Sequence, residues 1–160
     1  MIRPVRPEDA AAIAAIYNDY VQHTTISFET EPLTPREMRG RIEQYAAHYP
    51  YLVEEQGGVI CGFCYAHPWK DRAAYRHTWE TTVYLHPQYR GKGIGSALMQ
   101  ELITRCREAG CHVLIACITG DNTASCAFHR RLGFTQVSRF PEVGCKFGKW
   151  LDVVDYQYML

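Results

Sequence analysis

The sequence predicts one α/β (α+β) domain spanning residues 1–160, with three layers in which helices flank a mixed, mostly antiparallel central sheet. Three observations lead to this fold class. The chain has 160 residues and is 47% hydrophobic, enough to bury a core. Its early strands are joined by a tight hairpin turn. Its later strands alternate with amphipathic segments, as in strand–helix–strand units.

The first third of the chain favours a short strand at residues 2–5 and then two helices. The acidic turn at Pro7-Glu8-Asp9 opens the first helix, and residues 25–31 after it are polar, aromatic and irregular. The second helix begins at Thr34-Pro35-Arg36-Glu37, a capping box with proline at the first helical position, and runs to about residue 48. The apolar face of the first helix is formed by Ile13, Ile16, Tyr17 and Tyr20.

The middle of the chain predicts a hairpin of strands 51–55 and 59–66 that turns at Gly57-Gly58. A loop at residues 68–72 leads to a long strand at 77–85 and then to a glycine-rich turn. The helix after that turn places Ile94, Leu98, Leu102 and Cys106 on one face.

The last third predicts a strand at residues 112–118 and a helix at 121–132 closed by Gly133. Two final strands are expected at 135–140 and 153–159. A glycine-rich loop at residues 144–148 is expected to separate them.

Charge and hydropathy exclude several classes of protein. Lysine plus arginine and aspartate plus glutamate number 17 each, so no net field attracts nucleic acid or an anionic membrane. No apolar run approaches membrane-spanning length, and the first residues lack the apolar segment of a signal peptide. We therefore expect a cytoplasmic protein with no nucleic-acid or membrane partner.

The seven cysteines are odd in number and irregularly spaced, which favours reduced thiols over a disulfide framework. The pair Cys61-Gly62-Phe63-Cys64 lies in a strand-like run, where residues three apart point to opposite faces, so we expect the sulfurs not to converge. The histidines show no ligand spacing, and we predict no metal.

The stretch Arg90-Gly91-Lys92-Gly93-Ile94-Gly95 stands where a strand ends and a helix begins. Glycines at alternate positions leave backbone N–H groups uncovered, and the start of a helix adds partial positive charge. A pyrophosphate suits such a turn. The spacing matches neither a P-loop nor the Rossmann fingerprint.

The turn does match the pattern Arg/Gln-x-x-Gly-x-Gly, and with it the chain resembles the GNAT N-acetyltransferases. The segment from Asn122 to Phe134 is similar to a second motif of that family, an Asn-x-x-Ala helix ending in Gly-Phe. The resemblance covers nearly the whole chain. It implies acetyl-CoA as co-substrate, with its pyrophosphate on the glycine turn.

Longer strings narrow the resemblance to the phosphinothricin and methionine sulfoximine acetyltransferases. They lie at residues 27–32, 69–72, 75–84 and 146–153. Members acetylate the α-amino group of small amino-acid analogues and are commonly dimers with the site near the subunit interface. The resemblance thus implies a homodimer acting on a small-molecule amine.

Acetyl transfer from a thioester to an amine needs a base, because an α-amino group is largely ammonium at neutral pH. Glu80 is the candidate, one acid in an apolar-aromatic strand just before the glycine turn. We expect it to point into a splay of the sheet and to act directly or through water.

The resemblance assigns the coenzyme contacts. The backbone of Val83, Tyr84 and Leu85 would bind the pantetheine arm and polarise the thioester carbonyl. His129 replaces a tyrosine that protonates the leaving thiolate in many members, so it is a second catalytic candidate, or only a hydrogen-bonding partner of the coenzyme. The remaining coenzyme contacts are expected from Arg90, Gly91, Lys92, Gly93, Ile94, Gly95, Asn122 and Ser125.

The amine substrate carries a carboxylate, which a guanidinium can bind bidentately, so Arg72 is the candidate for that contact. Phe28 and Tyr75 would give the pocket its shape, with Lys146 a further candidate. Two alternatives stay open: a GNAT enzyme for another amine (polyamine, aminoglycoside or peptide N-terminus), and a non-catalytic acyl-CoA sensor.

Overall fold

The computed structural model describes residues 1–160 and contains one seven-stranded sheet, in the order β1-β2-β3-β4-β5-β7-β6. Every neighbouring pair is antiparallel except β4 and β5. The mixed, mostly antiparallel sheet predicted from the sequence is confirmed. The strands are β1 Ile2–Pro4, β2 Tyr51–Gln56, β3 Val59–Pro68, β4 Thr78–Leu85, β5 Val113–Thr119, β6 Thr135–Lys146 and β7 Lys149–Met159.

Four α-helices flank the sheet: α1 Ala10–His23, α2 Pro35–Ala46, α3 Ile94–Glu108 and α4 Thr123–Arg131. Short 3-10 turns precede α1, β4 and α3, at Pro7–Asp9, Ala73–Tyr75 and Pro87–Tyr89. The predicted capping box of the second helix is present, with the Thr34 hydroxyl accepting from the Glu37 N–H and the Glu37 carboxylate accepting from the Thr34 N–H.

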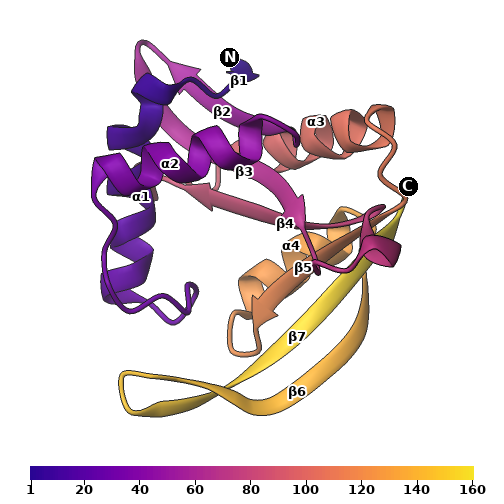
Figure 1. The fold of residues 1–160 in the computed structure, drawn as a ribbon. Helices are drawn as coiled ribbons and strands as arrows, with labels where there is room; N and C mark the ends of the chain where they lie inside the picture. The colour runs from indigo at the N-terminus through magenta and orange to yellow at the C-terminus, as the bar shows by residue number, and fades with distance from the viewer.

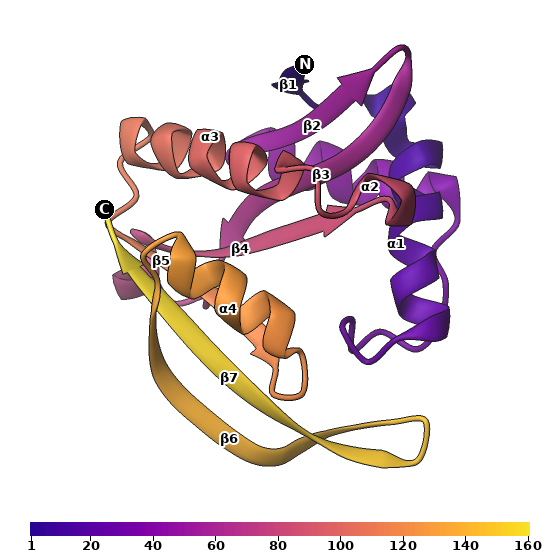
Figure 2. The same ribbon diagram turned by 180° about the vertical axis from the view of Figure 1, so that it is seen from behind.

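The helices cover the two faces of the sheet unequally (Figures 1 and 2). Helices α3 and α4 lie on one face, over a core cluster that reaches from Leu52 to Tyr156. Helices α1 and α2 lie on the other face, but their cluster involves only β2, β3 and the end of β4. No helix covers the α1/α2 face of β5, β7 and β6 (Figure 1).

The end of the chain differs from the prediction. Residues 140–153 were expected to contain a loop, but β6 and β7 continue into one long hairpin that turns at Phe147 and Gly148. Irregular pairing on β6 between Phe140 and Gly144 hides the alternation of a strand, because residues are inserted there without partners. Figure 1 shows this hairpin extending beyond the helices.

The predicted orientation of Cys61 and Cys64 towards opposite faces of the sheet is wrong. Cys61 and Cys64 both belong to the cluster under α3, because a bulge opposite Glu54 and Glu55 inserts Cys61 into β3 and shifts the alternation of side chains. All seven cysteines are unpaired. The Cys64 thiol donates to the Leu98 carbonyl at 3.5 Å, and its burial raises its pKa well above the usual range.

None of the four helices has the length and apolar character needed to cross a bilayer.

Candidate active site

Strands β4 and β5 form a fork. They pair only over Thr78–Glu80 and Val113–Ile115, and beyond those residues they diverge (Figure 1). Each strand keeps its other neighbour along the diverging part, β3 for β4 and β7 for β5. The fork is therefore a gap between two strands, each paired on its other side, with backbone edges that no strand of the protein occupies.

A cavity of about 460 Å³ fills this fork. Residues 81–84 line it from β4 and residues 116–119 line it from β5. Additional walls come from α1, α4 and the segment between α1 and α2. Of the residues predicted from the sequence, the cavity brings together Phe28, Glu80, Val83, Tyr84, Asn122, Ser125 and His129.

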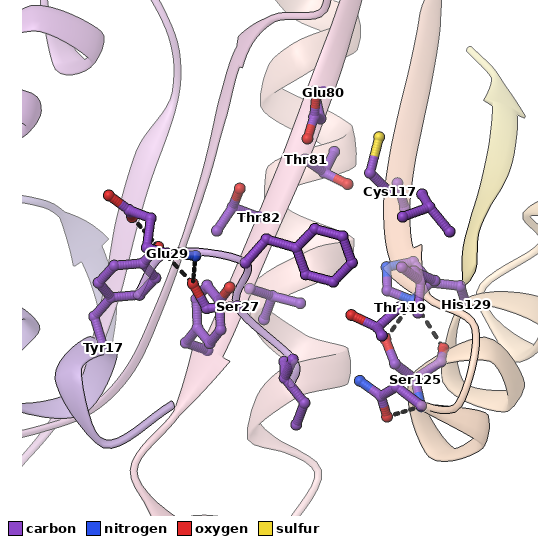
Figure 3. A pocket seen from close by; sticks show the side chains of 18 of the residues that line it. Tyr17, Ser27, Glu29, Glu80, Thr81, Thr82, Cys117, Thr119, Ser125 and His129 are labelled. Atoms are coloured by element: carbon purple, nitrogen blue, oxygen red, sulfur yellow. Dashed lines mark hydrogen bonds between the residues drawn. The ribbon is translucent and has the colours of Figure 1, made fainter. Parts of the chain in front are cut away.

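Glu80 lies where the fork begins, as predicted, with its side chain 25% exposed. Burial raises its pKa above the usual range of a glutamate, with the negative charge of Asp155 adding to the effect and the Cys117 thiol opposing it. His67 Nε2 lies 3.8 Å from Glu80 Oε1. Figure 3 shows Glu80 and Cys117 on facing strands at the same end of the gap. No arginine or lysine pairs with Glu80, so its carboxylate is available to a cation.

His129 is buried on α4, where its ring forms T-shaped contacts with the rings of Phe128 and Phe134. Its Nδ1 lies 2.9 Å from the Ser125 carbonyl oxygen, which can only accept, so Nδ1 carries the proton. Burial lowers the pKa of His129, which keeps the ring neutral near pH 7. The free nitrogen, Nε2, then presents a lone pair.

Asn122 caps α4, since its Oδ1 accepts from the Ser125 N–H at 3.2 Å. The same side chain lines the cavity. The capping role and a place in the site are therefore compatible.

The glycine turn follows the end of β4 and opens α3. Gly91 and Gly93 have φ of +74° and +79°, a conformation that side chains disfavour, with open space around both. The backbone N–H groups of residues 91–96 donate no hydrogen bond within the protein. Six free donors at a helix start form a site for an anion.

Two cations flank this turn without a carboxylate partner. The Arg90 guanidinium lies over the Tyr20 ring, 4.9 Å from its centroid, and the Lys92 ammonium lies 5.0 Å from that of Tyr89. Neither forms an ion pair, and both are exposed. Leu85 does not line the cavity, and its carbonyl accepts from the Tyr20 hydroxyl at 2.6 Å.

Three predicted substrate residues lie outside the cavity lining. Arg72 and Tyr75 belong to the connection between β3 and β4, which meets β4 at the Glu80 end, opposite the glycine turn. Lys146 is only 4% exposed, and its Nζ donates to the Ser27 carbonyl at 2.6 Å.

The sequence did not identify the polar group on the α1 side of the cavity. The Tyr17 hydroxyl contacts both Ser27 and Glu29, and the Arg41 guanidinium pairs with the Glu29 carboxylate (Figure 3 shows the first three). On β5, the Thr119 hydroxyl donates to the Thr25 carbonyl at 2.7 Å. These residues come from distant segments, so no local pattern indicated them.

The structure contains no group of three or more histidine, cysteine, aspartate or glutamate side chains that could hold a metal ion.

Comparison with known proteins gives a consistent result. Residues 13–134 match the family model of the acetyltransferase (GNAT) family. Phosphinothricin N-acetyltransferase from Alcaligenes faecalis is 43% identical over 96% of this chain and 79% of the relative. The L-methionine sulfoximine/L-methionine sulfone acetyltransferase of Salmonella typhimurium is 39% identical over 99% of this chain and 94% of the relative. The solved structure of a Salmonella typhimurium protein with its cofactor acetyl-CoA superposes with a TM-score of 0.97 at 38% identity, covering 100% of this chain and 93% of that one.

Proposed function

The chain belongs to the acetyltransferase (GNAT) family, and on that premise we propose that it moves the acetyl group of acetyl-CoA to the α-amino group of a small amino acid or analogue. Methionine sulfoximine, methionine sulfone and phosphinothricin are the proposed substrate types, because related enzymes carry those names. The observation that carries the proposal is the cavity in the fork, with the Glu80 carboxylate, which has no arginine or lysine partner, at its closed end.

The residues of this chain fit acetyl-CoA. The unoccupied N–H groups of residues 91–96 would hold the pyrophosphate, with Arg90 and Lys92 adding positive charge. The free backbone edges of Val83 and Tyr84 would pair with the amide groups of the pantetheine arm, as a strand would. When bound, the coenzyme supplies a thioester, whose carbonyl carbon is open to attack by an amine.

Glu80 would bind the substrate ammonium and take a proton from it, directly or through one water. Only the ionised carboxylate can do this. Its raised pKa brings it closer to that of the amine and makes the transfer less uphill than for an exposed glutamate. We propose Glu80 as the general base on this ground.

His129 is the candidate for the departing thiolate. Its neutral form has the proton on Nδ1, so only the imidazolium could donate from Nε2, and burial disfavours that form. The neutral ring is better suited to accept a hydrogen bond from the coenzyme. We therefore favour the second of the two roles predicted for His129, that of a coenzyme contact.

The charges in the cavity favour an amino acid over a polycationic amine. Two carboxylates line the cavity, those of Glu29 and Glu80. Arg41 neutralises the charge of Glu29, so Glu80 is the one carboxylate left to bind a substrate ammonium. A polyamine or an aminoglycoside carries several ammonium groups and needs more than one acid. Arg72 remains the proposed contact for the substrate carboxylate, with Tyr75 beside it, because their loop meets β4 next to Glu80.

We also propose a homodimer. Six large apolar side chains of the β6–β7 hairpin are about half or more exposed: Val137, Phe140, Val143, Phe147, Trp150 and Met159. So many exposed apolar groups on one element are typical of an interaction surface, and a second copy of the chain is the proposed occupant. Light scattering of the wild type and of Trp150→Ser tests this, with a dimer expected for the first and a shift toward monomer for the second.

A cytoplasmic location fits this proposal, because acetyl-CoA and free amino acids meet in that compartment. Cell fractionation would test it.

The substrate proposal is tested by a thiol-release assay with acetyl-CoA and a panel of amines. We expect turnover with methionine sulfoximine, methionine sulfone or phosphinothricin, and little with spermidine or an aminoglycoside. Turnover confined to peptides with a free N-terminus would overturn the substrate class. Binding of acetyl-CoA without turnover of any amine would favour the acyl-CoA sensor.

A further inference from the structure

Phe28 forms a wall of the cavity although it belongs to no helix or strand. It lies in the connection between α1 and α2, and 42% of the residue is exposed. Its immediate neighbour, Ser27, is 3% exposed and hydrogen-bonded to Tyr17 at 2.9 Å. A half-exposed aromatic ring on an irregular segment needs other elements to define its position.

Gly144 of β6 supports the ring directly. A Cβ atom built on Gly144 would lie 2.3 Å from Phe28 Cε2 and 2.7 Å from Cζ. Carbon atoms do not approach this closely, so any side chain at position 144 must displace the ring. The φ of Gly144 is not positive, so no left-handed backbone conformation calls for glycine at this position. Glycine is therefore required here for space and not for conformation.

Lys146, two residues further along β6, holds the same segment. Its Nζ donates to the Ser27 carbonyl at 2.6 Å, and no carboxylate forms an ion pair with it. A buried ammonium with one protein acceptor is costly, which makes that hydrogen bond expensive to break. Thr119 adds a third tie, to the Thr25 carbonyl.

We propose that Gly144 and Lys146 are positioning residues for the amine: together they fix where Phe28 stands, and so determine which amino-acid side chains the cavity accepts. The role rests on the proposed function. It replaces, for Lys146, the direct substrate contact predicted from the sequence, and it gives Gly144 a role that its sequence context did not suggest.

Kinetics of Gly144→Ala test the proposal, with Gly40→Ala as the matched control, since a Cβ at Gly40 meets nothing within 4 Å. We expect Gly144→Ala to raise KM for methionine sulfone about tenfold, with a smaller change in kcat, because a displaced wall misplaces the substrate. The ratio of kcat/KM for methionine sulfone to that for alanine should change as well. Gly40→Ala should leave KM and this ratio within twofold of the wild-type values.

A double-mutant cycle with Phe28→Ala separates positioning of the ring from general damage. Without the ring, Gly144→Ala should change KM and the ratio by less than twofold. Equal effects of Gly144→Ala in the two backgrounds, or no effect in the wild type, would overturn the proposal.

Lys146→Met removes the ammonium but keeps a long apolar chain. We expect a rise in KM for the amine, with the affinity for acetyl-CoA unchanged. An unchanged KM would overturn the role of Lys146.

The same double-mutant cycle of Gly144→Ala and Phe28→Ala can be read out as melting temperature, a measurement that needs no substrate. Gly144→Ala should lower Tm in the wild type but not in Phe28→Ala. This result stands even if the wild type turns over none of the proposed amines, so a wrong substrate class is distinguishable from a wrong structural role. Equal Tm losses in both backgrounds would count against the contact.

Discussion

The two ends of the fork recognise their ligands by different means. At the glycine turn, the protein offers backbone N–H groups from one run of residues, 91–96. In the cavity that starts at Glu80, it offers side chains from distant elements, including Phe28, Glu80 and Cys117. A backbone site is encoded locally and needs few particular side chains, whereas a side-chain site depends on how separate segments pack. This difference explains which substitutions should impair coenzyme binding and which should impair turnover.

The largest effect expected is at Glu80. Glu80→Gln keeps the size of the side chain but removes the base, and kcat should fall about 100-fold or more. Steady-state kinetics with saturating acetyl-CoA would measure it, with the exposed Glu108→Gln as the control. A kcat within twofold of wild type would show that Glu80 is not the base.

Gly93→Ala should act on the other end. Its φ of +79° costs an alanine about 1–2 kcal/mol, and the new methyl group covers the turn. We expect acetyl-CoA to bind about tenfold more weakly by calorimetry. Gly58→Ala is a matched control, because Gly58 has φ of +81° and equally open surroundings but lies in the β2–β3 hairpin. It should lose stability without losing coenzyme affinity; similar affinity losses in both would contradict a specific turn site.

The cations at the turn should contribute less. Arg90→Ala and Lys92→Ala should each weaken acetyl-CoA binding about two- to fivefold at low salt, since both side chains are exposed. Added salt should shrink the difference. Lys70→Ala, an exposed lysine on the β3–β4 connection, serves as control. A loss of binding larger than that of Gly93→Ala would mean that side chains, not the backbone, dominate this end.

The smallest effect expected is on stability. The folded-state pKa of Glu80 is raised, so the ionised carboxylate destabilises the fold at neutral pH, and this penalty is absent below the unfolded-state pKa. Glu80→Gln should therefore raise Tm by about 2 °C at pH 7, with the gain disappearing as the pH falls below about 4. His67, Cys117 and Asp155 also face Glu80, so none of them should be substituted in the variants that are compared. A gain that persists at pH 3 would show a cause other than burial of charge.

The difference between a locally encoded site and one built from distant segments also explains which features could be predicted from the sequence. The glycine turn, the capping box at Thr34 and the place of Glu80 depend on short patterns, and the structure has all three where they were predicted. The β6–β7 hairpin was missed because irregular pairing interrupts its alternation. The contact of Gly144 with Phe28 joins residues 116 positions apart, and a glycine required for space has no signature in its neighbours. Local patterns therefore predicted the glycine turn better than the cavity residues proposed to meet the amine.

The division of the site into two ends is tested most directly by calorimetric titration of acetyl-CoA into Gly93→Ala, Glu80→Gln, Gly144→Ala and the wild type. We expect Gly93→Ala alone to lose affinity, about tenfold, while the other two variants bind within twofold of wild type. A loss in Glu80→Gln or Gly144→Ala as large as that in Gly93→Ala would contradict it.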